Sequence, residues 1–331
     1  MTDIDTLRFR AAVLQKLRSF FSEHGYTELD TPSLTPALIP DSGHEVFKTA
    51  YIDPWTDEDK PLYLVPSHDY FLKKAVAATK AAVFQLSKCF VNNETAGRLH
   101  SPEFTLLESY TPGASYNDTL SLMEELFTAL LPLCREKGNA AWFKPPFLSL
   151  SLDETFATYA GFSLSENMEQ EKLAEKVRQL GIAEFPDNPF DDWAINELFE
   201  LIMCQCIEPA LPKDKCVLIT GWPVFMPELA KENSWKEMWT LYINGTVTAR
   251  SRSEETDTHR IKSFLERENK MQNATSRIKQ NADIDFWKTF QNYPDCASIT
   301  LEVDKLIMFL DGKKSIESVQ PFPFRLKTGY Y

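Results

Sequence analysis

The sequence predicts an α+β fold, in which helices flank a mainly antiparallel β-sheet. Strand-like segments come in pairs joined by short turns, and helical segments fall between them without the strict alternation that marks a parallel sheet. Hydrophobic residues make up 43% of the 331 residues and aromatic residues 12%, which is enough for a sizeable core. We expect one domain over residues 1–331, with a helical insert at about 165–212.

An amphipathic helix is predicted over residues 6–23. Its apolar residues recur at three- and four-residue steps: Leu7, Ala11, Leu14, Leu17 and Phe21. A short strand follows at 26–30. Residues 36–59 are rich in Pro, Asp and Gly and are predicted to form a loop, before a strand at 62–66 and a helix that opens at 67–69.

Residues 84–110 form the most distinctive segment, which we interpret as two strands joined by a polar turn. In the second strand, Glu108 falls on the same face as Phe104, Leu106 and Tyr110. A carboxylate on an apolar face needs a partner, because an unpaired buried charge is costly. Two interpretations of Glu108 and Tyr110 follow. Either both are residues of a functional site, or Glu108 is a core acid with hydrogen-bond partners and Tyr110 is an ordinary tyrosine of the strand.

The remaining chain mixes predicted helices and strands. Helices are expected at 117–136, 166–180, 193–208 and 253–274. Strands are expected at 145–152, 216–220 and 237–245, the last with a hairpin signal, and a strand running into a helix is expected at 297–310.

Charge and composition limit the partners. The chain has 48 acidic and 35 basic residues, a net charge of −13, and no long basic tract. Nucleic-acid binding needs local Lys and Arg enrichment, so tRNA is disfavoured and a basic protein partner fits better. No apolar segment reaches about 18 residues and the N-terminus has no apolar signal region, so we expect a cytoplasmic protein without membrane contact.

The six cysteines are scattered along the sequence. Cys204 and Cys206 lie in an apolar helical segment, and no second Cys or His pair stands at ligand spacing. We therefore expect reduced core thiols and no metal site built from cysteines.

Residues 100–110 read HSPEFTLLESY, and residues 90–94 read FVNNE. This pair of segments resembles motif 2 of the class II aminoacyl-tRNA synthetases, in the lysine, aspartate and asparagine subgroup. Residues 6–32 resemble motif 1, which builds the homodimer interface in that family. The resemblance implies the class II catalytic fold, and a homodimer formed through the N-terminal helix and strand.

The lysine branch of this family implies a pocket for a cationic amino acid. Fixed acids suit the ammonium groups of such a substrate. The match assigns six residues to substrate binding: Ser67, His68, Asp69, Glu108, Tyr110 and Glu254. Asp69 would be a shortened form of the family's glutamate. Without the resemblance it would be an acid in the first turn of a helix, where a carboxylate complements the macrodipole.

The resemblance also implies ATP and Mg²⁺, but residues that bind them in the family are replaced. Val91 stands in place of the phosphate-binding arginine of motif 2, and Thr240 and Val247 stand in place of two metal-binding acids. In motif 3, Glu302 replaces a glycine and Lys305 replaces an arginine. The lysine keeps the positive charge but not the bidentate hydrogen bonding of a guanidinium group. The nucleotide-binding positions implied by the match are Asn92, Asn93, Glu94, Arg98, His100, Ser101, Phe104 and Lys305.

Two further cations stand close to the lost metal-binding acids. Arg250 replaces the family's asparagine, and Arg252 follows it by two residues. Both are possible electrostatic substitutes for Mg²⁺. Phe104 would stack on the adenine of a bound nucleotide.

The resemblance extends over nearly the whole chain, and we expect no anticodon-binding domain. The chain is most similar to the lysyltransferases of elongation factor P, the GenX/PoxA type. That type uses ATP to activate lysine or (R)-β-lysine and attaches it to a lysine of elongation factor P. Two alternatives stay open: a pseudoenzyme paralogue that binds an amino-acid-like ligand or a protein partner without adenylating, and a ligase that uses Arg250 and Arg252 on a different nucleotide or acid.

Overall fold

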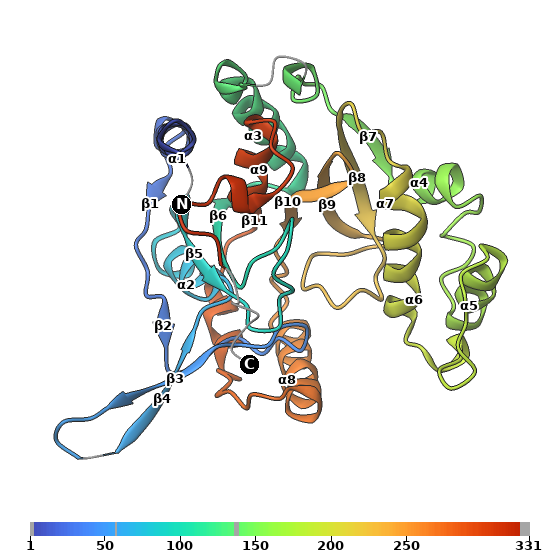
Figure 1. The fold of residues 1–331 in the computed structure, drawn as a ribbon. Helices are drawn as coiled ribbons and strands as arrows, with labels where there is room; N and C mark the ends of the chain where they lie inside the picture. Colours follow the sequence, from blue (N-terminus) through green and yellow to red (C-terminus); the bar gives the residue numbers. More distant parts are fainter. Residues whose placement is uncertain (1–2, 57, 136–138, 325–331) are drawn as a thin grey trace, which may run out of the picture.

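The computed structural model describes residues 3–56, 58–135 and 139–324, and its centre is a twisted sheet (Figure 1). The strand order of this eight-stranded sheet is β1 (Thr27–Glu28), β5 (Val83–Phe90), β6 (Glu103–Pro112), β11 (Cys296–Glu302), β10 (Thr246–Ser253), β9 (Lys236–Ile243), β8 (Cys216–Trp222) and β7 (Leu148–Ser151). Its pairs are antiparallel except β1–β5 and β7–β8. The predicted α+β class is confirmed.

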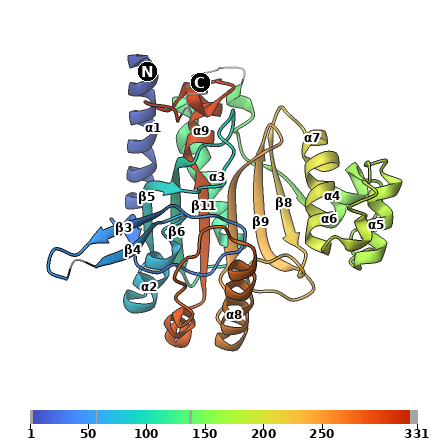
Figure 2. The same ribbon diagram turned by 60° about the horizontal axis from the view of Figure 1, so that its bottom comes forward.

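One face of the sheet is covered by three helices, α1 (Ile4–Glu23), α3 (Tyr116–Leu130) and α9 (Val303–Leu310), as Figure 2 shows. Successive strand residues point to opposite faces. In β9, Trp239 and Leu241 are fully buried in the core beneath these helices, while Met238 and Tyr242 pack on the other face. Asp3 caps the N-terminus of α1, because its carboxylate accepts hydrogen bonds from the backbone N–H groups of Asp5 and Thr6.

The opposite face is bordered by helices at both ends. At one end lie α2 (Asp69–Thr79) and α8 (Thr258–Thr275), packed around Leu72, Tyr110 and Leu265. At the other end lie α4 (Leu152–Tyr159), α5 (Gln170–Gln179), α6 (Ile195–Ile202) and α7 (Glu208–Ala210) (Figure 1). Among the described helices, none is long and apolar enough to cross a membrane.

A buried ion pair links α1 and α9 to the start of β6. The Arg10 guanidinium lies 2.6 Å from a carboxylate oxygen of Asp304, and both side chains are less than a tenth exposed. Arg10 also donates to the Thr105 hydroxyl at 2.9 Å, and the backbone N–H of Thr105 donates to Asp304 at 2.9 Å. These bonds hold Thr105, and with it the neighbouring Phe104, at a defined position on the sheet.

The prediction of a loop over residues 36–59 is wrong in part. It contains β3 (Lys48–Ile52), which pairs with β4 (Asp59–Leu64) and with β2 (Leu34–Thr35) makes a three-stranded sheet. The β3–β4 hairpin projects from the body of the molecule (Figures 1 and 2). Every residue of β3 is exposed, so no alternation of apolar and polar residues marks the strand in the sequence.

Several predicted helices have different bounds. The helix expected from residue 253 begins only at Thr258, because the Asp257 side chain caps it by accepting from the N–H groups of His259 and Arg260. Residue 253 instead ends β10. The helix expected over 193–208 is α6 followed by a π-helical turn, Met203–Ile207, and α7. That turn leaves Cys204 exposed, so this thiol is not in the core as predicted.

The helix predicted over 117–136 ends earlier. α3 stops at Leu130, and a short 3₁₀ turn, Leu131–Leu133, follows with Pro132 inside it. Proline cannot donate the hydrogen bond that would continue the helix. The predicted end at Glu136 lies outside the described residues.

Candidate functional site

A cavity of about 1560 Å³ opens on the sheet face that α1, α3 and α9 leave uncovered. Its floor is made by alternate residues of adjacent strands, which form two cross-strand rows. Every member of the two rows lines the cavity except Thr240, at the end of the first row. The register pairs in the first row are Glu108 with Thr300, Thr300 with Arg250, and Arg250 with Thr240. In the second row they are Tyr110 with Ser298, Ser298 with Arg252, and Arg252 with Met238.

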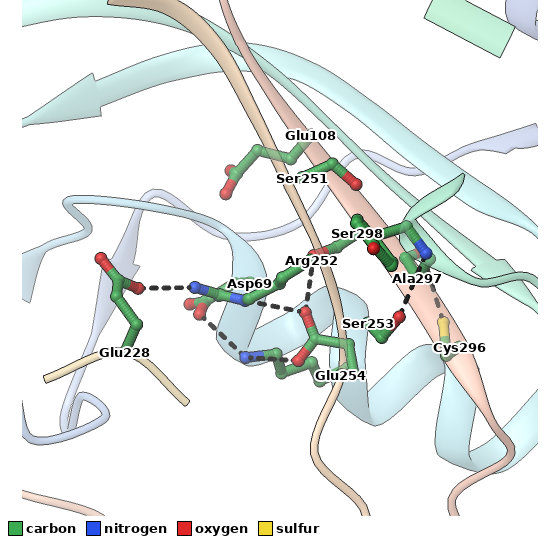
Figure 3. Close-up of polar contacts among 12 residues, drawn as sticks. Asp69, Glu108, Glu228, Ser251, Arg252, Ser253, Glu254, Cys296, Ala297 and Ser298 are labelled. Atoms are coloured by element: carbon green, nitrogen blue, oxygen red, sulfur yellow. Dashed lines mark hydrogen bonds and ion pairs between the residues drawn. The ribbon is translucent and has the colours of Figure 1, made fainter. Parts of the chain in front are cut away.

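Three carboxylates line one end of this cavity, Asp69, Glu108 and Glu228. The buried Glu254 joins them through its ion pairs with Lys73 and Arg252, and we call the four the acid cluster. They come from the start of α2, from β6, from the segment after β8 and from the residue after β10. Figure 3 shows them around the side chain of Arg252.

Glu254 is fully buried and paired. Its two oxygens lie 3.1 Å from Arg252 Nε and 3.4 Å from Lys73 Nζ, and the Ser298 hydroxyl donates to it at 2.6 Å. Burial acts to raise the pKa of Glu254, but Lys73 and Arg252 outweigh burial, so the pKa lies below its ordinary value. Glu254 is therefore ionised, and its negative charge is balanced by the ion pairs with Lys73 and Arg252.

Glu108 has a different environment. The Ser67 hydroxyl donates to one of its oxygens, and the backbone N–H of His68 donates to the other at 2.8 Å. Burial, and then the nearby Asp69 carboxylate, raise the pKa of Glu108 to about 7. Glu108 consequently exchanges a proton near neutral pH, unlike Glu254.

Arg252 lies inside the acid cluster. Its guanidinium bridges Glu254 and Glu228, each at 3.1 Å (Figure 3). The structure thus places Arg252 among the acids predicted to receive the substrate ammonium group. Glu254 raises the Arg252 pKa well above its ordinary value against the effect of burial, so the guanidinium stays charged.

Lys73 was not among the predicted site residues. Its ammonium group lies 3.3 Å from Asp69 and 3.4 Å from Glu254, and its side chain is only 4% exposed. Lys73 follows Asp69 by four residues on α2, and this helical spacing was the signal in the sequence. Glu228 lies in an irregular segment, where no pattern pointed to it.

Of the six predicted substrate residues, four line the cavity, Ser67, Asp69, Glu108 and Tyr110, whereas the buried His68 and Glu254 do not. The His68 ring is buried between the Thr31 hydroxyl, 2.8 Å away, and the Lys88 carbonyl, 3.1 Å away. Burial lowers the pKa of His68, which favours the neutral ring. His68 therefore faces the site only through its backbone N–H. Burial and Glu254 raise the pKa of Tyr110, which keeps its hydroxyl protonated.

The predicted nucleotide-binding residues separate into two groups. Those that line the cavity are Glu94, His100, Ser101, Phe104 and Lys305. The others, Asn92, Asn93 and Arg98, do not. The Asn92 amide donates to the Val46 carbonyl at 3.2 Å, and the Asn93 side-chain carbonyl accepts from the Glu45 backbone N–H at 3.2 Å. These two asparagines are therefore hydrogen-bonded to the segment that contains Glu45 and Val46.

Most cations of the cavity are already paired. Lys305 lies 2.6 Å from Glu302, and Arg260 pairs with Glu232 and with Glu255. Of the Lys and Arg side chains that line the cavity, Arg250 is the one with no carboxylate within ion-pair distance among residues 3–56, 58–135 and 139–324. Arg250 is also exposed, so it is the cation most accessible to a phosphate or carboxylate group.

Two positions at which the resemblance implies metal-binding acids do not fit Mg²⁺. Oxygen ligands from carboxylates are what Mg²⁺ takes from proteins, and the matching positions on β9 and β10 carry Thr240 and Val247. No group of three or more His, Cys, Asp or Glu side chains in the described part of the chain is arranged to bind a metal ion. The half-buried ring of Phe104 remains available in the cavity to a nucleotide base.

Comparison with known proteins gives one family. Residues 4–326 match the family model described as tRNA synthetases class II (D, K and N). The chain is 31% identical over 327 residues to a protein of Avibacterium paragallinarum, covering 96% of this chain and 95% of that protein. It is 30% identical over 324 residues to one of Photorhabdus laumondii subsp. laumondii, with the same two coverages. Both are named elongation factor P--(R)-beta-lysine ligase. The chain therefore belongs to the class II tRNA synthetase family of the D, K and N type.

Proposed function

We propose that the chain binds a cationic amino acid, lysine or (R)-β-lysine, at the acid cluster and ligates its carboxyl group to a lysine of elongation factor P. One observation carries the proposal: the acid cluster has four carboxylates, three of them in the cavity, and within the described residues its ion pairs are with two cations, Lys73 and Arg252. With Glu108 ionised the cluster has a net charge of −2, because four negative charges meet two positive ones. Such a cluster attracts an ammonium group. The names of the curated relatives support the ligation step and its acceptor.

Asp69 and Glu108 are the acids that would receive the ammonium group. Glu254 is already held by Lys73, Arg252 and Ser298, whereas Asp69 meets Lys73 alone and keeps a quarter of its side chain exposed. Glu108 has hydrogen bonds but no ion pair within the described residues. An ammonium ligand would supply the missing positive charge.

The second candidate function is that of a binding protein that does not adenylate. The replaced phosphate and metal positions favour it: Val91 is buried, Lys305 is paired with Glu302, and Thr240 and Val247 supply no carboxylate. Loss of a single group that stabilises the transition state costs about 10²–10³ in rate. Under this candidate, the pocket recognises an amino-acid-like ligand without activating its carboxyl group.

Two assays test these candidate functions. One is calorimetric titration with lysine and (R)-β-lysine, with and without ATP and Mg²⁺, and the other is a pyrophosphate-exchange assay. A ligase should bind an amino acid, exchange pyrophosphate, and transfer the labelled amino acid to purified elongation factor P. The second candidate predicts binding without exchange. If neither amino acid binds, the assignment of the pocket is wrong.

Glu108→Gln is expected to weaken amino-acid binding about 10- to 100-fold, because hydrogen bonds to a charged group are the strong ones. The measurement is the same titration, above pH 7 so that Glu108 is ionised. Glu103→Gln is the matched control, since Glu103 is an exposed acid on the same strand. Equal affinities for the two variants would contradict the placement of the ammonium group.

A further inference from the structure

A second cavity, of about 230 Å³, lies beside the large one, and we call it the side pocket. It lies between the helical segment α6–α7 and the strands β8, β9 and β10. The π-helical turn Met203–Ile207 contributes Met203 and Cys204 to its lining. Such turns interrupt regular helices and are frequent at functional sites.

Two buried hydrogen-bond donors of the side pocket have no partner. The Thr240 hydroxyl and the Trp222 indole N–H make no hydrogen bond within the described residues, and the two side chains are 0% and 8% exposed. Buried polar groups in folded proteins are almost always hydrogen-bonded, and an unpaired one is costly. Two unpaired donors in one cavity therefore indicate an acceptor that the chain does not itself supply.

The side pocket shares Glu228 with the acid cluster but lies away from Asp69 and Glu108, the acids that would receive the ammonium group. Thr240 is the last member of the first cross-strand row, and three strand spacings separate it from Glu108. Neighbouring strands lie about 4.8 Å apart, so the two positions are about 14 Å from each other. An amino acid bound at Glu108 would leave the donors of the side pocket unpaired.

The walls of the side pocket define the body of the ligand. Met203, Met226 and Met238 line it beside the Trp222 ring, and all four are buried. Methionine side chains adapt to apolar ligands. An apolar cavity of about 150 Å³ holds a molecule as large as benzene, so this one has room for a somewhat larger compact group.

The charges around the side pocket define the head of the ligand. Glu200, Glu208 and Glu228 face it together with one unpaired cation, Arg250. Glu228 is paired with Arg252, and the Tyr242 hydroxyl is hydrogen-bonded to Glu208. The excess of acids disfavours an anion. An uncharged carbonyl can instead accept from Thr240 and Trp222, and an amide N–H can donate to Glu200 or Glu208.

We propose that the side pocket binds a small uncharged carbonyl compound, a carboxamide with a compact apolar group, held by the Thr240 hydroxyl and the Trp222 indole. This site goes beyond the proposed function, because it neither receives the ammonium group nor contains the acids that do. It also lies where the family would place a metal-binding acid, at Thr240, so the replacement that removes the metal ligand opens a site of different chemistry.

The test uses 4-methylpentanamide as the probe and 4-methylpentanoate as the comparison, each titrated calorimetrically into the 331-residue protein. The amide is expected to bind more tightly than the carboxylate. Thr240→Val keeps the shape of the side chain and removes its hydroxyl, so it should weaken amide binding about tenfold. Trp222→Phe should weaken it by a similar factor. Neither effect requires the protein to bind lysine, so this test is independent of the proposed function.

Thr248→Val is the matched control. Thr248 is equally buried, but its hydroxyl donates to the Thr246 carbonyl at 3.1 Å and it does not line the side pocket. Thr248→Val should lower the melting temperature without changing amide binding, whereas Thr240→Val should not lower it, because its hydroxyl has no partner to lose. The proposal is overturned if 4-methylpentanoate binds more tightly than the amide, if the amide does not bind, or if Thr240→Val and Trp222→Phe leave amide binding unchanged. Absent amide binding together with a lower melting temperature of Thr240→Val would mean that ordered water alone satisfies the hydroxyl.

Discussion

Asp304→Ala is expected to lower the free energy of unfolding by about 3–5 kcal/mol, the largest effect of a single substitution that we predict. Asp304 is 2.6 Å from Arg10, and their side chains are 4% and 8% exposed. Removing the carboxylate leaves the Arg10 guanidinium buried without a countercharge. It also removes the acceptor for the backbone N–H of Thr105, so the start of β6 loses an anchor.

Urea unfolding of the ligand-free protein measures this effect. Lys172→Ala is the control, because Lys172 and Glu169 form an exposed ion pair at 2.8 Å, and such pairs contribute less than about 1 kcal/mol. The double replacement Arg10→Met with Asp304→Leu should recover most of the lost stability, since no charge is then left buried. Equal losses for Asp304→Ala and Lys172→Ala would show that the buried pair does not hold α1, α9 and β6 together.

Glu108 is expected to contribute to the stability of the ligand-free protein, and this contribution should decrease as the pH rises from 4.5 to about 7. The pKa of Glu108 rises from its ordinary 4.5 to about 7 in the folded protein. Between these values the folded state binds the proton more tightly than the unfolded state does. Protonation therefore stabilises the fold, and this contribution is lost as the pH rises through the folded pKa. A shift of this size corresponds to roughly 3 kcal/mol.

The comparison of wild type with Glu108→Gln isolates this contribution, because other groups titrate alike in both proteins. Thermal or urea unfolding at about pH 5 and about pH 8 should give wild type a steeper loss of stability than Glu108→Gln. Glu103→Gln should follow wild type. Affinity for an ammonium ligand should change in the opposite direction, increasing with pH, because binding needs the ionised carboxylate. Parallel pH profiles for wild type and Glu108→Gln would refute the raised pKa.

The sequence predicted the parts of the fold that periodicity marks strongly. The strand pair around residues 84–110 is confirmed as β5 and β6, and the hairpin signal near residue 244 is confirmed as the turn between β9 and β10. Alternation placed Glu108 and Tyr110 on one face, and both line the cavity. The exposed strand β3 was missed because backbone pairing with β4, rather than burial of alternate side chains, forms it.

The candidate site was predictable only where local spacing defined it. Asp69, Glu108 and Glu254 stand at fixed positions in motif-like segments, and the structure brings all three into one cluster. For His68 the same local match could not show which way the ring points. That direction depends on Thr31 and Lys88, which lie on other segments.

The sequence alone determined the fold class, the paired strands and three of the four acids, Asp69, Glu108 and Glu254, because these follow from residue type and from spacing within local segments. Only the tertiary structure decided which cations those acids hold. Arg250 and Arg252 are two residues apart on one strand, yet Arg252 bridges Glu254 and Glu228 whereas Arg250 has no ion pair within the described residues. The difference comes from the segment that carries Glu228, whose approach to β10 brings a carboxylate within 3.1 Å of one arginine and not of the other.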